Sequence, residues 1–136
     1  MLQDWSLRME THNLIFLKKS QIFAFSLCSP VAYMAGWTSS QIKEALDIMN
    51  SHGIKGDKAG TTLRFILVRL LQPPECLEPI LKKYDLSYED VAPGQNDFIL
   101  ILGNLRVLSF REIVSIFGLQ VGVDVLEVIH KKVENE

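Results

Sequence analysis

Apolar residues recur at intervals of three or four positions along much of the chain, and this spacing predicts helices. The most apolar stretch is 61–71, in which Arg64 and Arg69 are the only charged residues. A helix that is apolar on every side is normally surrounded by other elements. We therefore predict that this stretch is the central helix of the fold, with Thr61 or Thr62 as its N-cap.

The residues before this stretch predict a second helix with clear ends. Thr38 followed by Gln41 three positions later is the pattern of a capping box. Gly53 is placed to close the helix in a left-handed conformation. The predicted helix runs from about 39 to 52.

The same signals predict a helix near the C-terminal end. Ser109 and Glu112 form a second capping-box pattern, and Gly118 follows as the closing residue. The last segment alternates through Val121, Val123 and Val125, which permits a short strand, whereas the pattern from Leu126 onward is helical.

Two other segments fit either a helix or a β-hairpin. Residues 13–27 and 97–108 both show helical spacing, yet each also contains two short apolar runs around a polar or glycine-containing centre. We favour helix for both. Pro30 is then expected to end or kink the first of these helices.

These elements predict an all-α fold, a compact bundle of six or seven short helices. The 136 residues fit a single domain, 1–136. Within it, the pattern of segment 1–36 allows more secondary-structure interpretations than any other part of the chain. With 48% hydrophobic and 22% charged residues, the composition is that of a globular protein.

Charge and hydropathy reduce the range of partners. The formal net charge is −2, so no overall basic field attracts nucleic acid or an anionic membrane. The apolar run 20–37 contains Pro30 and several serines and is shorter than the roughly 20 residues of a membrane span. We expect it to be part of the core, and we expect no membrane partner.

The sequence contains no recognisable catalytic or metal-binding motif. Cys28 and Cys76 lack the spacing of a metal or redox pair, and His12, His52 and His130 lack partners spaced for a shared metal. We therefore expect no enzyme activity, no cofactor and no small-molecule substrate. Unpaired cysteines favour a reducing compartment, so we expect an intracellular, cytoplasmic protein.

The loop 53–62 combines glycines with lysines but is not a phosphate-binding loop of the P-loop kind. It lacks both a preceding strand and a Gly-Lys-Ser/Thr ending. We interpret it mainly as a connector. A weaker alternative is an anion site at the start of the next helix, formed by Lys55, Lys58 and Arg64.

One alternative function is DNA binding through a helix-turn-helix at 109–132. The predicted helix lengths suit this motif. The chemistry disfavours it, because the second helix carries Asp124 and Glu127 where a recognition helix needs basic or amide side chains, and Lys131 and Lys132 come only at its end.

We favour a non-enzymatic protein-protein interaction module, an adaptor or assembly module whose partner is another protein or a second copy of itself. The chain has more large apolar residues than a small bundle readily buries, notably Trp5, Trp37, Phe98, Phe110 and Phe117. Exposed aromatic residues often anchor partners. The candidate partner-binding residues are Trp5, Trp37, Phe110 and Phe117.

Overall fold

A computed structural model describes the backbone of residues 19–135 and the side chains of residues 21–129. This part of the chain forms seven α-helices and one short 3-10 helix, without a strand. The helices are α2 (Lys19–Ala35), α3 (Ser39–Ser51), α4 (Asp57–Leu71), α5 (Leu77–Lys83), the 3-10 helix η1 (Tyr88–Asp90), α6 (Phe98–Leu105), α7 (Phe110–Phe117) and α8 (Leu119–Asn135). The predicted all-α bundle is confirmed.

Both segments with a hairpin alternative contain helix and no strand where the structure describes them. Residues 19–27 belong to α2, and 98–105 form α6. The remaining residues of the first ambiguous segment, 13–18, lie outside the described part of the chain.

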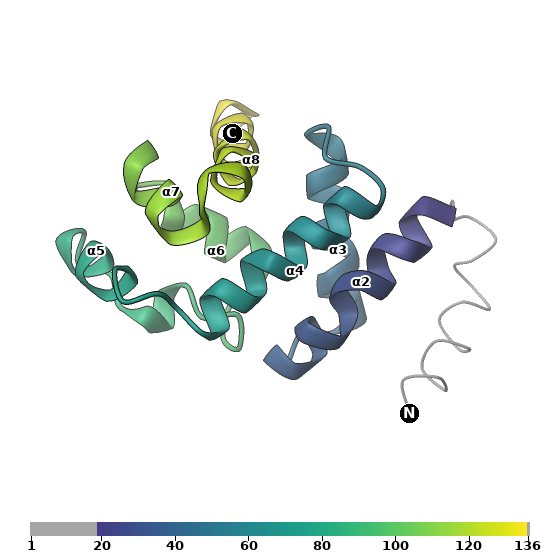
Figure 1. Cartoon of the computed structure of the whole chain (residues 1–136), viewed down its shortest axis with the longest axis horizontal. Coiled ribbons are helices and arrows are strands. Elements are labelled where there is room, and N and C mark those ends of the chain that lie inside the picture. The colour runs from purple at the N-terminus through teal and green to yellow at the C-terminus, as the bar shows by residue number, and fades with distance from the viewer. Residues whose placement is uncertain (1–18, 136) are drawn as a thin grey trace.

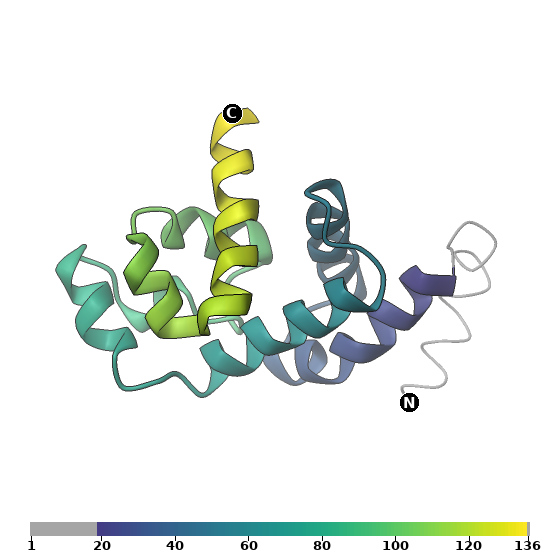
Figure 2. The same ribbon diagram turned by 45° about the horizontal axis from the view of Figure 1, so that its top comes forward.

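Helix α4 lies at the centre of the arrangement, as predicted. In Figure 1 it runs between α2 and α3 on one side and the group α5 to α8 on the other. It packs most extensively on α2 and also contacts α3, α7 and α8. In Figure 2, α8 runs steeply across the direction of α2 and α4, and its C-terminal turns extend beyond the other helices of its group.

The start and the outer side of α4 differ from the prediction. The helix begins at Asp57 after Gly56, whose φ is +63°, so that Thr62 is a buried residue inside the helix and not its N-cap. Gly56 tolerates this backbone conformation because it has no Cβ. Phe65 and Val68 are exposed, so one side of the central helix is uncovered.

The predicted helix boundaries at α3 and α7 are confirmed. The Thr38 hydroxyl accepts a hydrogen bond from the Gln41 N–H at 3.2 Å, and the Gln41 side chain accepts one from the Thr38 N–H at 2.7 Å. Ser109 and Glu112 repeat this arrangement at α7. Gly53 and Gly118 close the two helices with positive φ angles of +89° and +86°.

The end of α2 and the start of α8 differ from the sequence-based expectations. Pro30 does not end α2, which continues through it to Ala35. Helix α8 starts at Leu119 and already includes the alternating valines that permitted a strand. Gly122 lies directly against Val114 of α7, and this close packing of two helices favours helix over the alternation pattern.

Candidate interaction surface

Helix α2 buries mainly small residues against the rest of the fold. The buried side chains of this helix are all small: Ala24, Cys28, Ser29, Ala32 and Ala35. Ala24 lies directly against α4, where a Cβ placed on Gly60 would lie 2.3 Å from the Ala24 carbonyl oxygen. Only small residues permit two helix backbones to approach this closely. Of the larger side chains of α2, Phe25, Val31 and Tyr33 pack partly buried against the core, whereas Phe23 and Met34 are exposed.

The opposite side of α2 forms what we call the α2 outer face, made of Phe23, Leu27, Pro30 and Met34. Phe23 is 54% exposed and Met34 is 84% exposed, while Leu27 is half-buried. The four residues are spaced by four, three and four positions, which places them on one side of a helix. The exposed Ser26 lies beside them, and its hydroxyl donates to the Ile22 carbonyl oxygen. This face is therefore mainly apolar, uncharged and open to solvent at Phe23, Pro30 and Met34 in the described structure.

The expectation that residues 20–37 belong to the core is therefore only partly correct. The small residues and Trp37 are buried, whereas Phe23 and Met34 are exposed. A sequence signal for this arrangement exists, because small residues recur at 24, 28, 32 and 35 on one side and larger ones on the other. Average hydrophobicity does not detect it, since both sides are apolar.

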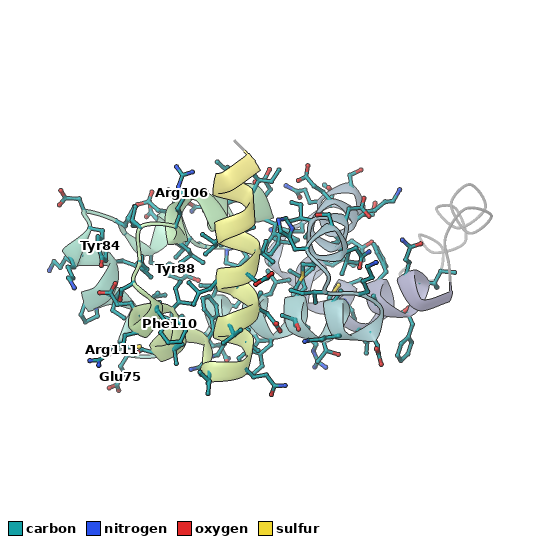
Figure 3. All side chains as sticks on the ribbon, turned by 90° about the horizontal axis from the view of Figure 1, so that it is seen from above. Glu75, Tyr84, Tyr88, Arg106, Phe110 and Arg111 are labelled. Atoms are coloured by element: carbon teal, nitrogen blue, oxygen red, sulfur yellow. The ribbon has the colours of Figure 1, made fainter. Side chains whose placement is uncertain are left out.

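A second group of exposed apolar residues lies on α7 and α8. Phe110, the first residue of α7, is 55% exposed, and Leu119 and Val123 are exposed on α8. Figure 3 shows Phe110 at the end of the molecule that also carries Arg111 and Glu75. Phe110 is thus a large aromatic side chain on the surface, and its role as a partner-binding residue stays a prediction.

The other candidate partner-binding residues lie elsewhere. Trp37 is 4% exposed, and its indole N–H donates to the carbonyl oxygens of Pro93 and Asn96, at 2.8 and 3.0 Å. Phe117 is also buried in the core. Both side chains are engaged in packing. Trp5 lies outside the described residues.

The three candidate anion-binding residues do not lie at one place, because Lys55 is in the loop before α4 and the other two lie at different positions along the helix. Lys58 lies 3.7 Å from the Asp124 carboxylate of α8, and Arg64 is two turns along α4, about 10 Å from the helix start at 1.5 Å per residue. Asp57 already places a negative charge in the first turn. Because this acid offsets the positive end of the helix dipole, it disfavours a bound anion.

The geometry of α7 and α8 also bears on the DNA-binding alternative. Only Gly118 separates the two helices, and α8 packs along α7. From Leu119 to Ile129, α8 has no Lys or Arg, and its exposed side includes Val123 and Glu127. This face offers neither phosphate contacts nor base-reading amides apart from Gln120, so no observation favours DNA as the ligand.

A charged cluster joins α5 to the start of α7. Lys83 Nζ lies 3.0 Å from Glu112 Oε2, and the Tyr84 hydroxyl donates to Glu112 Oε1. The backbone N–H of Ser109, the Tyr84 hydroxyl and the Lys83 ammonium together lower the pKa of Glu112 to about 2. The same contacts raise the pKa of Lys83 and of Tyr84. The cluster links two elements and leaves Glu112 ionised, which suits a structural contact.

Cys28 is fully buried in the hydrophobic core. Burial raises the pKa of Cys28 to about 12, so its thiol stays protonated and unreactive. Within the described residues, no three His, Cys, Asp or Glu side chains are close enough to hold a metal ion.

Two surface depressions are open and shallow. One, of about 500 Å³, lies along α3 and includes Lys43, Glu44 and Asp47. The other, of about 430 Å³, lies at the corner between α4 and α5 and includes Pro73, Pro74 and Tyr88. No helix in the described part of the chain is both long and apolar enough to cross a membrane.

Comparison with known proteins gives one partial similarity. The chain is 33% identical over 67 residues, 49% of its length, to a tape measure protein of Pneumococcus phage Dp-1. The matched region is 6% of the length of that relative. No protein-family model matches the chain, and no solved structure matches it.

Proposed function

We propose that this chain is a non-enzymatic protein-protein interaction module that takes part in the assembly of a larger protein structure. The observation that carries the proposal is the α2 outer face, where Phe23 and Met34 are largely exposed on a helix whose small residues face the core. Large apolar side chains exposed in a continuous row are typical of surfaces that bind other proteins.

Two further points support this function. The relative is named as a tape measure protein of a phage, and a small part of such a long protein is compatible with an assembly role. The exposed Phe110 adds a second aromatic contact point on α7, a helix that lies on the other side of α4 from α2 (Figure 1). We further propose an intracellular, cytoplasmic location, which the two free cysteines support.

The proposal is tested by immobilising the purified chain and offering it cell extract together with a soluble copy of the chain carrying a different tag. Nuclease treatment and salt at about 0.5 M remove contacts made through nucleic acid, because salt screens phosphate binding far more than apolar contacts. We expect at least one protein, the second copy or another, to be retained in stoichiometric amount.

The matched bait for this experiment is the double variant Phe23→Ser, Met34→Ser, which removes apolar contact area at two exposed positions. It should retain much less of the same protein. Retention of no protein by the wild-type bait would contradict the proposed function, and equal retention of protein by both baits would contradict its assignment to α2.

A further inference from the structure

The surface of α2 lacks charge over an unusual length. From Gln21 to Gln41 the sequence contains no Asp, Glu, Lys or Arg. The neighbouring α3, in contrast, directs Lys43, Glu44 and Asp47 to solvent. Exposed large apolar residues on an uncharged helix are typical of a surface that another element or partner covers. Helices α4 and α3 contact α2 but leave Phe23 and Met34 exposed, so the outer face is available for a further partner.

The spacing of the residues on the α2 outer face suits packing against another helix. Steps of four, three and four residues between Phe23, Leu27, Pro30 and Met34 are those of a helix-to-helix seam, in which apolar side chains of one helix fit between those of another. The seam extends about 16 Å, from eleven residues at 1.5 Å each. Its form favours a second helix as the occupant.

A membrane surface is a poorer fit to the same face. Helices that lie in a lipid interface carry Lys or Arg on their polar side and expose that side to water. Helix α2 has no basic residue after Lys19, and the side opposite the outer face is buried against α4. The occupant therefore has to be an apolar and uncharged protein surface.

We propose that a second copy of this chain covers the α2 outer face, with α2 of one copy packed on α2 of the other around a two-fold axis. In such a pair each face meets itself, so any charge on the face would be repelled by its own copy. The absence of charge from Gln21 to Gln41 removes that repulsion, and the chain itself supplies an uncharged helix of the right form. This inference rests on the proposed interaction function and names its partner.

The first test is the solution mass of the purified full chain, measured by sedimentation equilibrium from roughly 1 to 100 μM, with and without salt at about 0.5 M. We expect a dimer whose dissociation constant is insensitive to salt. The variants Phe23→Glu and Met34→Glu should each weaken dimerisation at least about tenfold, because a two-fold axis places each new carboxylate in an apolar interface.

The matched control is Leu100→Glu on α6, since Leu100 is 54% exposed, the same fraction as Phe23. It should leave the dimer unchanged. A wild-type monomer at every concentration, or a dimer weakened equally by all three substitutions, would overturn the proposal.

The monomer outcome also identifies the alternative. If the chain is a monomer and Phe23→Glu lowers its stability to urea more than Leu100→Glu does, a segment of the same chain covers α2. If both variants are equally stable, no segment of the same chain covers α2, and retention of another protein by the immobilised chain decides whether a different protein does. Either result would overturn the second copy as occupant while leaving the general interaction function testable by retention of another protein.

Cross-linking gives an independent measurement. In a Cys76→Ser background, Phe23→Cys and Met34→Cys chains are oxidised separately and as a mixture. A parallel pair links each variant to itself, and an antiparallel pair links the two variants to each other. Cys28 does not interfere, because it is buried. The absence of a disulfide dimer in all three samples would contradict the pairing of α2 with α2.

Discussion

At the scale of single residues, Glu112 has contacts on both of its carboxylate oxygens. Oε1 accepts hydrogen bonds from the Ser109 N–H, at 2.8 Å, and from the Tyr84 hydroxyl, while Oε2 contacts Lys83. The capping box that the sequence predicts for α7 thus also ties that helix to the end of α5. All these contacts favour the ionised carboxylate, and they lower its pKa from 4.5 to about 2.

The lowered pKa predicts a pH-dependent contribution to stability. A carboxyl group whose pKa is lower in the folded state stabilises the fold above its unfolded pKa, and this contribution is lost as the pH falls through the folded value. We expect Glu112→Gln to be less stable than the wild type near neutral pH, with a difference that shrinks between about pH 5 and pH 2. Urea unfolding at a series of pH values measures the difference.

The control for this prediction is Glu44→Gln, which changes an exposed carboxylate on α3. Its effect should be small at every pH. If the difference between the wild type and Glu112→Gln stays constant down to pH 2, the contacts of Glu112 do not favour its ionised form.

Gly60 provides a second prediction at this scale. A Cβ at this position would lie 2.3 Å from the Ala24 carbonyl oxygen, and a backbone atom cannot move aside without displacing α2 from α4. We expect Gly60→Ala to lower the free energy of unfolding by about 1–3 kcal/mol or more, as overpacking does. Thermal or urea unfolding measures the change.

Gly103→Ala is the matched control, because Gly103 also lies within a helix but has nothing within 4 Å of its would-be Cβ. Alanine is the better helix former by about 1 kcal/mol, so this variant should be as stable as the wild type or more stable. Equal stability of both variants would show that α2 and α4 do not approach closely at Gly60.

At the scale of the elements, helix ends were predictable from sequence where local chemistry determines them. Thr38, Ser109, Gly53 and Gly118 act as expected because each cap depends on residues only a few positions away. The start of α4 was missed, because Thr62 has the chemistry of an N-cap but is held inside the helix and buried. Tertiary packing, which local patterns do not contain, outweighs that preference.

The candidate surface was predictable only in part, for a related reason. Phe110 is exposed, whereas Trp37 and Phe117 are buried by neighbours distant in sequence. The apolar run 20–37 predicts core packing, yet the α2 outer face within it is exposed. Whether a large apolar residue is covered depends on which side of the helix its neighbour approaches, and here the small residues Ala24 and Cys28 determine that side.

Trp37 connects elements that are distant in sequence, which gives a prediction at this scale. Its indole N–H donates to the carbonyl oxygens of Pro93 and Asn96. Its ring packs edge-on against the Phe98 ring, and the two ring centroids are 6.4 Å apart. Trp37→Phe keeps a ring but removes the donor, so we expect a loss of about 1–3 kcal/mol in the free energy of unfolding.

A second substitution separates the two contributions of this side chain. Trp37→Leu removes the aromatic contact with Phe98 as well as the donor, and it should be the less stable of the two variants. Urea unfolding gives both values. Wild-type stability of Trp37→Phe would mean that the hydrogen bonds to the segment before α6 do not stabilise the fold.

At the scale of the whole molecule, one hydrophobic cluster contains buried residues from Ala24 on α2 to Ile129 on α8. Helix α4 contacts both α2 and α3 on one side and α7 and α8 on the other. Its fully buried residues, such as Leu67, belong to this shared cluster. This arrangement favours cooperative unfolding of both groups of helices, which is the behaviour expected of the predicted single domain.

Leu67→Ala tests this cooperativity. Removing a fully buried leucine side chain is expected to lower the free energy of unfolding by about 2–5 kcal/mol. If α4 couples the two groups, hydrogen exchange of the most protected amides in α3 and in α8 should accelerate by the same factor, since both would exchange through the same global opening. The neighbouring Val68→Ala, at an exposed position, should change both rates little. Acceleration confined to one group would show that the two sides of α4 unfold separately, and the chain would then contain two cooperative units that share one helix.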